Sequence, residues 1–217
     1  MKSIKRILIA GVLGATFASA TSVNAQSGKE WAMYGGDYAN TRYSSLNQIN
    51  TKNVGKLRVA WIRSRGSLES QEATPVVVGD TMYVSTSSGP RYVFALNAKD
   101  GTIKWKYEPE LPRDFMSTVC CGLDNRGVAY ANGRVFVTRL DAKMVALDAN
   151  TGKELWSTTV MEYQLGHSIT SPPLIVKDLV VTGYAGGEYG VRGALQAYRQ
   201  DTGQMVWKTH TIPGPGE

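Results

Sequence analysis

The chain repeats a short residue pattern every 51 positions, and this spacing constrains its fold more than any other feature. The three copies cover residues 95–106, 146–157 and 197–208. In each copy an alanine comes first, a glycine follows six residues later, and a tryptophan stands four residues after the glycine. Agreement at three positions over two intervals indicates a structural repeat, in which each unit packs against its neighbours.

Each unit predicts four β-strands. The glycine lies between two short apolar runs, where it supplies the positive φ of a tight hairpin turn. A second hairpin precedes each copy, at residues 76–84, 128–137 and 174–181. No segment has a helical periodicity long enough to compete. Two hairpins per period make one blade, so the sequence predicts an all-β fold, a β-propeller of about three four-stranded blades whose tryptophans fill the gaps between blades.

The first 25 residues predict a secretory signal peptide. Lys2, Lys5 and Arg6 form a positive start, and residues 7–20 carry no charge. Small residues follow at 23–25, and the apolar stretch is too short to cross ~30 Å of hydrocarbon, although an uncleaved membrane anchor is the alternative. We therefore expect residues 1–25 to be removed on export to the periplasm, and residues 26–217 to form one propeller domain without a membrane span.

The charge of the mature chain excludes a nucleic-acid partner. Three of the 24 basic residues and none of the 18 acidic ones lie in the first 25 residues, which leaves a net charge of +3. The remaining lysines and arginines are scattered along the chain. Binding to nucleic acid requires a clustered basic face, and the sequence predicts none.

Residues that occur in one copy of a repeat, and not in the others, are candidates for function. Cys120 and Cys121 are adjacent and are the only cysteines. Adjacent Cα atoms lie ~3.8 Å apart, below the usual span of a disulfide, so a bridge between them would be a strained eight-membered ring. Such a ring offers a rigid surface for a flat ligand. The alternative is a pair of buried, reduced thiols.

Two further features interrupt the repeat. Arg126 either pairs with a carboxylate in a cleft or is a surface arginine before a turn. A glycine-rich loop at residues 183–190 separates the second and third strands of the third unit, and its glycines let the backbone approach a ligand closely. Glu188 in this loop suits a hard cation such as Ca²⁺, and the alternative is an exposed glutamate in an ordinary loop.

Taken together, these motifs resemble the methanol/ethanol family of dehydrogenases that depend on pyrroloquinoline quinone (PQQ). The resemblance rests on residues 31–37, 40–44, 71–75, 120–127 and 186–193, and it extends from about Lys29 to the end of the chain. It implies an eight-bladed propeller in which the repeated tryptophan docks each blade onto the next. It also implies a periplasmic enzyme that oxidises primary alcohols to aldehydes.

The resemblance assigns cofactor contacts to residues of all three units. It implies that Cys120 and Cys121 form a vicinal disulfide on one face of the planar quinone. Glu72 and Arg126 match positions that bind the polar groups of PQQ, including its carboxylates. Thr170 matches a position whose hydroxyl contacts the cofactor.

The glycine-rich loop matches the part of the family that lies beside the cofactor and its metal. Ala185, Gly186 and Gly187 would lie against PQQ, although relatives that carry serine in place of Ala185 gain a side-chain contact there. Glu188 would be a ligand of Ca²⁺ or a lanthanide. The cation would polarise the quinone C5 carbonyl and favour hydride uptake from the alcohol carbon. The catalytic aspartate of the family belongs to later blades, so we assign no catalytic residue to this chain.

The resemblance also implies partners and a larger protein. We expect a small primary alcohol as substrate, a cytochrome c as electron acceptor and a homodimer of the full-length form. Since three blades cannot close a ring, the chain is expected to be the N-terminal portion of a longer enzyme and to be inactive alone. The alternatives are a non-enzymatic periplasmic propeller of the outer-membrane assembly type, and a quinoprotein for sugars or polyols, which the cysteine pair disfavours.

Overall fold

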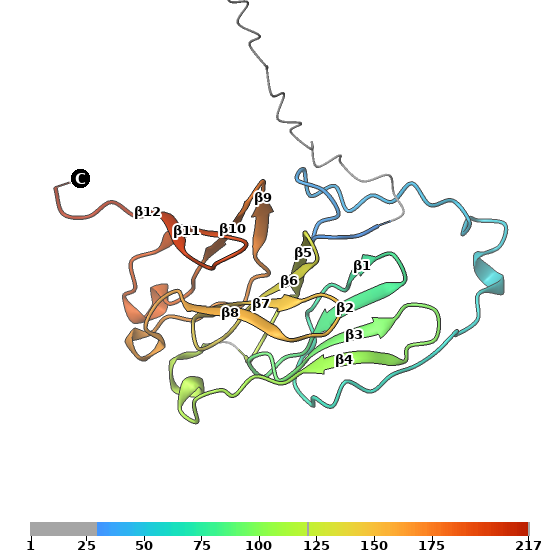
Figure 1. The fold of residues 1–217 in the computed structure, drawn as a ribbon, viewed down its shortest axis with the longest axis horizontal. Coiled ribbons are helices and arrows are strands. Elements are labelled where there is room, and N and C mark those ends of the chain that lie inside the picture. Colours follow the sequence, from blue (N-terminus) through green and yellow to red (C-terminus); the bar gives the residue numbers. More distant parts are fainter. Residues whose placement is uncertain (1–29, 121, 217) are drawn as a thin grey trace, which may run out of the picture.

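The computed structural model describes residues 30–120 and 122–216, and this part of the chain contains three four-stranded antiparallel sheets (Figure 1). The first comprises β1 (Val76–Val78), β2 (Thr81–Ser85), β3 (Val93–Asn97) and β4 (Ile103–Tyr107). The second comprises β5 (Val128–Ala131), β6 (Arg134–Thr138), β7 (Lys143–Asp148) and β8 (Glu154–Thr159). The third comprises β9 (Leu174–Val176), β10 (Leu179–Gly183), β11 (Ala194–Arg199) and β12 (Met205–His210). The predicted all-β architecture and its hairpins are confirmed.

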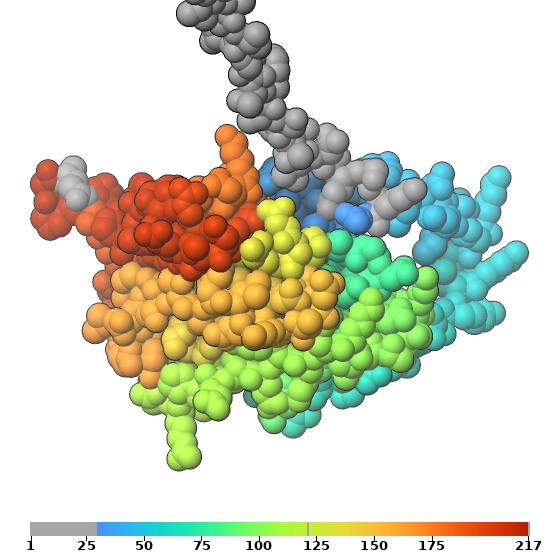
Figure 2. Space-filling view, viewed as in Figure 1, coloured from blue at the N-terminus to red at the C-terminus, as the bar shows by residue number. Residues whose placement is uncertain are grey.

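The sheets follow one another in chain order, as the green, orange and red regions of Figure 2 show. Strand β1 contacts β5, and β5 contacts β9, so the first strands of the three sheets converge. Backbone hydrogen bonds join the segments just before these strands. The Thr74 amide donates to the Arg126 carbonyl at 3.2 Å, and the Arg126 amide donates to the Thr170 carbonyl at 2.9 Å. The residues that precede the first strands therefore form one continuous, cross-linked line.

The repeated glycine closes the same turn in each sheet. Gly101, Gly152 and Gly203 have φ angles of 70°, 73° and 69°. In each turn the glycine amide donates to the carbonyl four residues earlier, at 2.9, 2.8 and 2.9 Å. This left-handed conformation favours glycine, as the repeat predicts. A Cβ at any of the three would also lie within 2.6 Å of a tryptophan ring.

Those rings belong to tryptophans that dock one unit onto the next. Each indole lies on the glycine of the following turn, and its Nε1 donates to the carbonyl three residues before that glycine. The donors and acceptors are Trp61 to Ala98 at 3.1 Å, Trp105 to Ala149 at 2.9 Å and Trp156 to Gln200 at 3.0 Å. The predicted docking role is confirmed for Trp105 and Trp156. The structure adds Trp61, which stands outside the 51-residue period, while Trp207 is 39% exposed.

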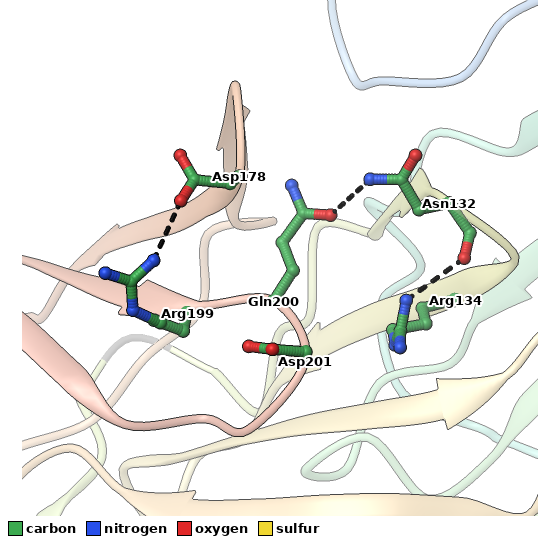
Figure 3. Close-up of a pocket in the computed structure, with 6 residues that line it drawn as sticks. All are labelled: Asn132, Arg134, Asp178, Arg199, Gln200 and Asp201. Carbon is green, nitrogen blue, oxygen red and sulfur yellow. Dashed lines mark hydrogen bonds and ion pairs between the residues drawn. The ribbon is translucent and has the colours of Figure 1, made fainter. Parts of the chain in front are cut away.

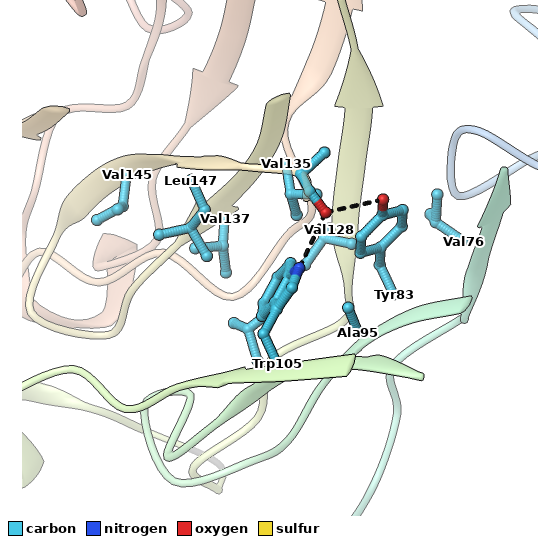
Figure 4. Packing of buried hydrophobic residues seen from close by; sticks show 11 residues of the cluster. Val76, Tyr83, Ala95, Trp105, Val128, Val135, Val137, Val145 and Leu147 are labelled. Atoms are coloured by element: carbon cyan, nitrogen blue, oxygen red, sulfur yellow. Dashed lines mark hydrogen bonds between the residues drawn. The ribbon is translucent and has the colours of Figure 1, made fainter. Parts of the chain in front are cut away.

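The apolar core lies between the sheets. In the first sheet, cross-strand pairing aligns Val76, Tyr83, Ala95 and Trp105 in one row that faces the second sheet (Figure 4). The Tyr83 hydroxyl and the Trp105 indole donate to the same carbonyl, that of Ala149. We call this line of four residues a docking row. The second sheet's docking row packs against the third sheet and comprises Ala129, Phe136, Ala146 and Trp156.

The segment before β1 crosses all three sheets. Trp31 and Val77 exchange two backbone hydrogen bonds of 2.8 Å, and the Tyr130 amide donates to the Ala32 carbonyl at 3.1 Å. The Tyr38 hydroxyl donates to the Ile175 carbonyl at 2.7 Å. Four short 3₁₀ helices complete the described elements: η1 (Val54–Lys56), η2 (Phe115–Thr118), η3 (Tyr163–Leu165) and η4 (Gly187–Tyr189). None of the helices in the described ranges has the length and apolar character needed to cross a membrane.

Candidate cofactor-binding site

Arg126 brings together three of the residues that the sequence assigns to the cofactor. Its Nε lies 2.9 Å from Glu72 Oε2, and its Nη1 donates to Thr170 Oγ1 at 2.6 Å. Glu72 precedes β1, Arg126 precedes β5 and Thr170 precedes β9, so each sheet contributes one residue. The Arg126 and Glu72 side chains are 39% and 41% exposed, which leaves the cluster open to a ligand.

The third nitrogen of Arg126 lies near a second carboxylate. Arg126 Nη2 lies 4.0 Å from Asp124 Oδ2, beyond hydrogen-bond distance. Asp124 is buried, and within the described ranges its Oδ1 has no hydrogen-bond partner. Two carboxylates thus face one guanidinium, so an anionic ligand needs a further positive charge nearby. This requirement fits a cofactor carboxylate that binds Arg126 together with a metal cation.

The backbone at Arg126 is held by the buried side chain of Asn125. The Ser85 hydroxyl and the Gly127 amide both donate to Asn125 Oδ1, the latter at 3.1 Å. Asn125 Nδ2 donates to the Thr138 carbonyl at 2.8 Å. These bonds satisfy the amide and join two sheets, so a rigid scaffold positions Arg126. Asn125 and Asp124 are not among the site residues that the sequence predicts, and their place beside Arg126 is the one signal that marks them.

The cysteine pair is described in part. Cys120 ends the first described range, and Cys121 lies outside the described residues. The vicinal disulfide therefore stays a prediction. Cys120 comes six residues before Arg126 in the chain.

The glycine-rich loop joins β10 to β11, where the sequence predicts it. Ala185 and Ser168 exchange two backbone hydrogen bonds of 2.8 and 3.4 Å, which tie the loop to the segment that leads to Thr170. Gly186 has a φ of 131°, and a Cβ there would lie 2.2 Å from the Gly166 carbonyl oxygen. Packing inside the protein thus requires Gly186. Gly187 has open space at its Cα and is exposed, as is Ala185.

Glu188 lies in the 3₁₀ helix η4 of this loop, with its side chain exposed. Within residues 30–120 and 122–216, no three His, Cys, Asp or Glu side chains gather into a group that could hold a metal ion. Among the described residues, Glu188 is therefore a single carboxylate without the partners that a metal site needs. A cation bound there would take its other ligands from the cofactor or from other polypeptide segments.

A polar cavity of about 220 Å³ lies between the second and third sheets, at the strand ends opposite the Arg126 cluster (Figure 3). Its groups bind one another. Arg199 pairs with Asp178 at 3.0 Å, and Asn132 Nδ2 donates to Gln200 Oε1 at 2.8 Å. The Arg199–Asp178 pair lies within the third sheet, whereas the Asn132–Gln200 bond joins turns of neighbouring sheets, so we interpret the cavity as part of the packing between blades.

Residues 31–217 match the family described as "PQQ: Glucose/ethanol/alcohol dehydrogenase, beta-propeller domain". The chain belongs to this family. The resemblance based on the motifs is therefore confirmed, and PQQ is the family's cofactor. The match extends from Trp31, at the crossing segment, through all three sheets.

Individual relatives agree with this assignment. The chain is 50% identical to the lanthanide-dependent methanol dehydrogenase of Methylacidiphilum fumariolicum over 87% of the chain and 31% of the relative. It is 43% identical to the quinohemoprotein alcohol dehydrogenase of Comamonas testosteroni, over 88% of the chain and 27% of the relative. The solved structure of a europium-containing methanol dehydrogenase has a TM-score of 0.83 and 48% identity, over 87% of the chain and 33% of that structure. The chain thus spans about a third of these relatives.

Proposed function

We propose that this chain is the N-terminal portion of a PQQ- and metal-dependent dehydrogenase that oxidises primary alcohols of the methanol/ethanol class to aldehydes. One observation carries the proposal. Glu72, before β1, and Thr170, before β9, both bind the partly exposed guanidinium of Arg126, which lies before β5. Membership of the PQQ family and the names of the relatives support it.

Each residue of the cluster has a role in holding the cofactor. Arg126 Nη2 would pair with a carboxylate of the cofactor, while its Nε and Nη1 stay bound to Glu72 and Thr170. The Thr170 hydroxyl and the Glu72 carboxylate also offer polar contacts to the ligand. PQQ, when bound, supplies the acceptor for the hydride of the alcohol. The Cys120–Cys121 ring would cover one face of the quinone, and Ala185, Gly186 and Gly187 would line its edge.

The cation is assigned to Glu188. Exposed carboxylate oxygen is a ligand for hard cations, so Ca²⁺ and a lanthanide both suit the position. The relative from Methylacidiphilum fumariolicum is named as lanthanide-dependent, which favours a lanthanide. When bound, the cation would supply Lewis-acid chemistry beside the cofactor.

An open docking row supports a longer propeller. In the third sheet, cross-strand pairing aligns Leu174, Val181, Ala197 and Trp207 as the equivalent of the two covered rows. Leu174 is 45% exposed and Trp207 is 39% exposed, whereas Trp105 in the first row is 8% exposed. Large apolar rows of this kind are covered by a neighbouring sheet. We assign the catalytic base and the remaining metal ligands to such further blades.

The setting of the enzyme is also part of the proposal. Residues 1–25 have the composition of a signal peptide and lie outside the described residues, so we propose a periplasmic location. A cytochrome c is the proposed electron acceptor, in keeping with the quinohemoprotein relatives. A homodimer is proposed for the full-length form.

The proposal is tested first by binding. The purified chain is titrated with PQQ in the presence of La³⁺ or Ca²⁺, and we expect saturable binding that Arg126→Gln weakens by at least tenfold. Asp178→Asn, at the exposed ion pair on the opposite strand ends, is the matched control and should leave the Kd unchanged. Absence of PQQ binding with either cation would contradict the proposal.

Turnover is tested on the longer reading frame that contains this sequence. Its product, loaded with PQQ and La³⁺ or Ca²⁺, should reduce an artificial dye when methanol or ethanol is added. If the product binds PQQ but neither alcohol leads to dye reduction, the proposed cofactor stands and the proposed substrate class is wrong.

A further inference from the structure

The Glu72–Arg126 pair depends on its surroundings for its geometry. Both side chains are long and about two-fifths exposed, and an ion pair of this kind contributes little to its own positioning. Both residues also lie in irregular backbone, before β1 and before β5. The backbone hydrogen bond from Thr74 to Arg126 joins the two segments, and the side chains next to the ion pair need further contacts to hold them.

Two buried serines, Ser85 as the last residue of β2 and Ser87 just beyond the strand, reach both segments. Ser85 and Ser87 are 0% and 1% exposed. The Ser85 hydroxyl donates to the side chain of Asn125, the residue just before Arg126. The Ser87 hydroxyl accepts from the side-chain amide of Gln71, the residue just before Glu72. Each hydroxyl thus binds the residue that precedes one member of the pair.

The two serines are themselves fixed. Between them, Thr86 exchanges hydrogen bonds with Tyr92: the Thr86 amide donates to the Tyr92 carbonyl at 2.9 Å, and the Tyr92 amide donates to Thr86 Oγ1 at 3.0 Å. The Ser67 hydroxyl lies 2.8 Å from the Ser87 hydroxyl. The end of β2 is therefore a buried, hydrogen-bonded platform below both partners of the ion pair.

We propose that Ser85 and Ser87 are positioning residues that hold Arg126 and Glu72, respectively, in the geometry that binds the cofactor. This inference rests on the proposed function. Neither serine needs to touch the ligand: each acts through the side chain before the residue that does. Ser85 is the last residue of β2 and Ser87 lies two residues beyond it, where the chain has left the strand, and the two hydroxyls reach two different segments.

The test separates positioning from stability. Ser87→Ala alone removes one acceptor of the half-buried Gln71 amide, which keeps a 3.3 Å bond to the Glu69 carbonyl, and is expected to destabilise the fold. Replacing both partners, Ser87→Ala with Gln71→Leu, removes the polar groups together and should recover most of that loss. We expect the double variant to keep a tenfold or larger increase in the Kd for PQQ with La³⁺. Recovery of the wild-type Kd together with stability would overturn the proposal.

Ser85 is tested in parallel. Ser85→Ala should raise the same Kd by a similar factor. Val135→Ala is the control, because Val135 is fully buried in the core away from the cluster and its truncation lowers stability without altering the anchor. If Val135→Ala weakens PQQ binding as strongly as Ser85→Ala, loss of stability alone explains the effect and the proposal fails.

A second measurement needs no cofactor. The Arg126 Nε–H proton exchanges slowly with water while it is held by Glu72, and its NMR signal reports the pair directly. We expect Ser85→Ala and the Ser87→Ala/Gln71→Leu variant to accelerate this exchange several-fold, with Val135→Ala unchanged. Absence of PQQ binding to the wild-type chain would contradict the proposed function. Unchanged Nε–H exchange in the serine variants would contradict the positioning role of Ser85 and Ser87.

Discussion

Arg126 Nε lies 2.9 Å from Glu72 Oε2, although the two residues precede strands of different sheets. The contact forms because the segments before β1, β5 and β9 are joined by backbone hydrogen bonds, which place one side chain from each sheet at the same point. The cluster is thus a consequence of how the blades pack. Its energetic weight and that of its scaffold can be measured separately.

The ion pair itself should contribute little to stability. A double-mutant cycle with Glu72→Gln and Arg126→Gln, followed by urea unfolding, is expected to give a coupling of about 0.2–1 kcal/mol, because both side chains are partly solvated. The more exposed Arg199–Asp178 pair is the comparison and should give a smaller value. A coupling of several kcal/mol at Glu72–Arg126 would contradict this prediction.

The buried amide beside the pair should matter far more. Asn125→Ala leaves the Ser85 hydroxyl, the Gly127 amide and the Thr138 carbonyl without their partner in the core, and should lower the free energy of unfolding by about 2–4 kcal/mol. Asn150→Ala, at an exposed turn position, should stay within about 0.5 kcal/mol. Equal effects at the two asparagines would refute the scaffold role of Asn125.

The contribution of each docking tryptophan to stability should depend on how deeply its ring is buried. Trp105→Ala removes a ring that packs on Gly152 and is expected to cost about 3–5 kcal/mol in urea unfolding. Trp207→Ala, in the open docking row, should cost less than about 1 kcal/mol in this chain. The prediction fails if the two substitutions shift the urea midpoint equally.

The repeated glycine should be required for two reasons: its positive φ, and the lack of room for a Cβ beside the tryptophan ring. Gly152 and Gly133 have nearly the same φ, 73° and 71°, but a Cβ at Gly152 would lie 2.6 Å from Trp105, whereas Gly133 has nothing within 4 Å. We expect Gly133→Ala to cost about 1 kcal/mol from backbone strain, and Gly152→Ala about 1–3 kcal/mol more. Similar thermal midpoints for the two variants would show that the ring imposes no constraint.

Stability should fall at alkaline pH because of Tyr198. Burial raises the pKa of Tyr198 to about 12, above its ordinary value near 10. The folded state therefore retains the phenolic proton longer than the unfolded state. The stabilisation is complete below pH ~10 and is lost as the pH rises through about 12, by on the order of 2–3 kcal/mol.

Urea unfolding measured from pH 9 to 12 checks this, with tyrosinate absorbance as the direct signal. Burial, and then the hydrogen bond to Glu154, also raises the pKa of Tyr107, so Tyr198→Phe is needed to isolate the contribution of Tyr198. A wild-type stability that does not change between pH 10 and 12 would refute the prediction.

The repeat by itself determined the all-β architecture, the twelve-strand hairpin plan and the three glycine turns. These features follow from local physics. A glycine at fixed spacing selects a positive φ, and short apolar runs on either side select strands. The motif order likewise identified Glu72, Arg126 and Thr170 as candidates, although it could say nothing about contacts among them.

Only the tertiary structure decided which side chains meet. Trp61 packs on Gly101 in the same way as Trp105 and Trp156 pack on the glycines of the next two turns. Trp61, however, comes from the segment before β1 and does not follow the 51-residue spacing. In the sequence, Ser85, Ser87 and Asn125 look like ordinary polar residues. They gain their contacts when the end of β2 meets the segments before β1 and β5. Local propensity acts over a few residues, whereas the cluster at Arg126 is made by packing between sheets, which no local pattern encodes.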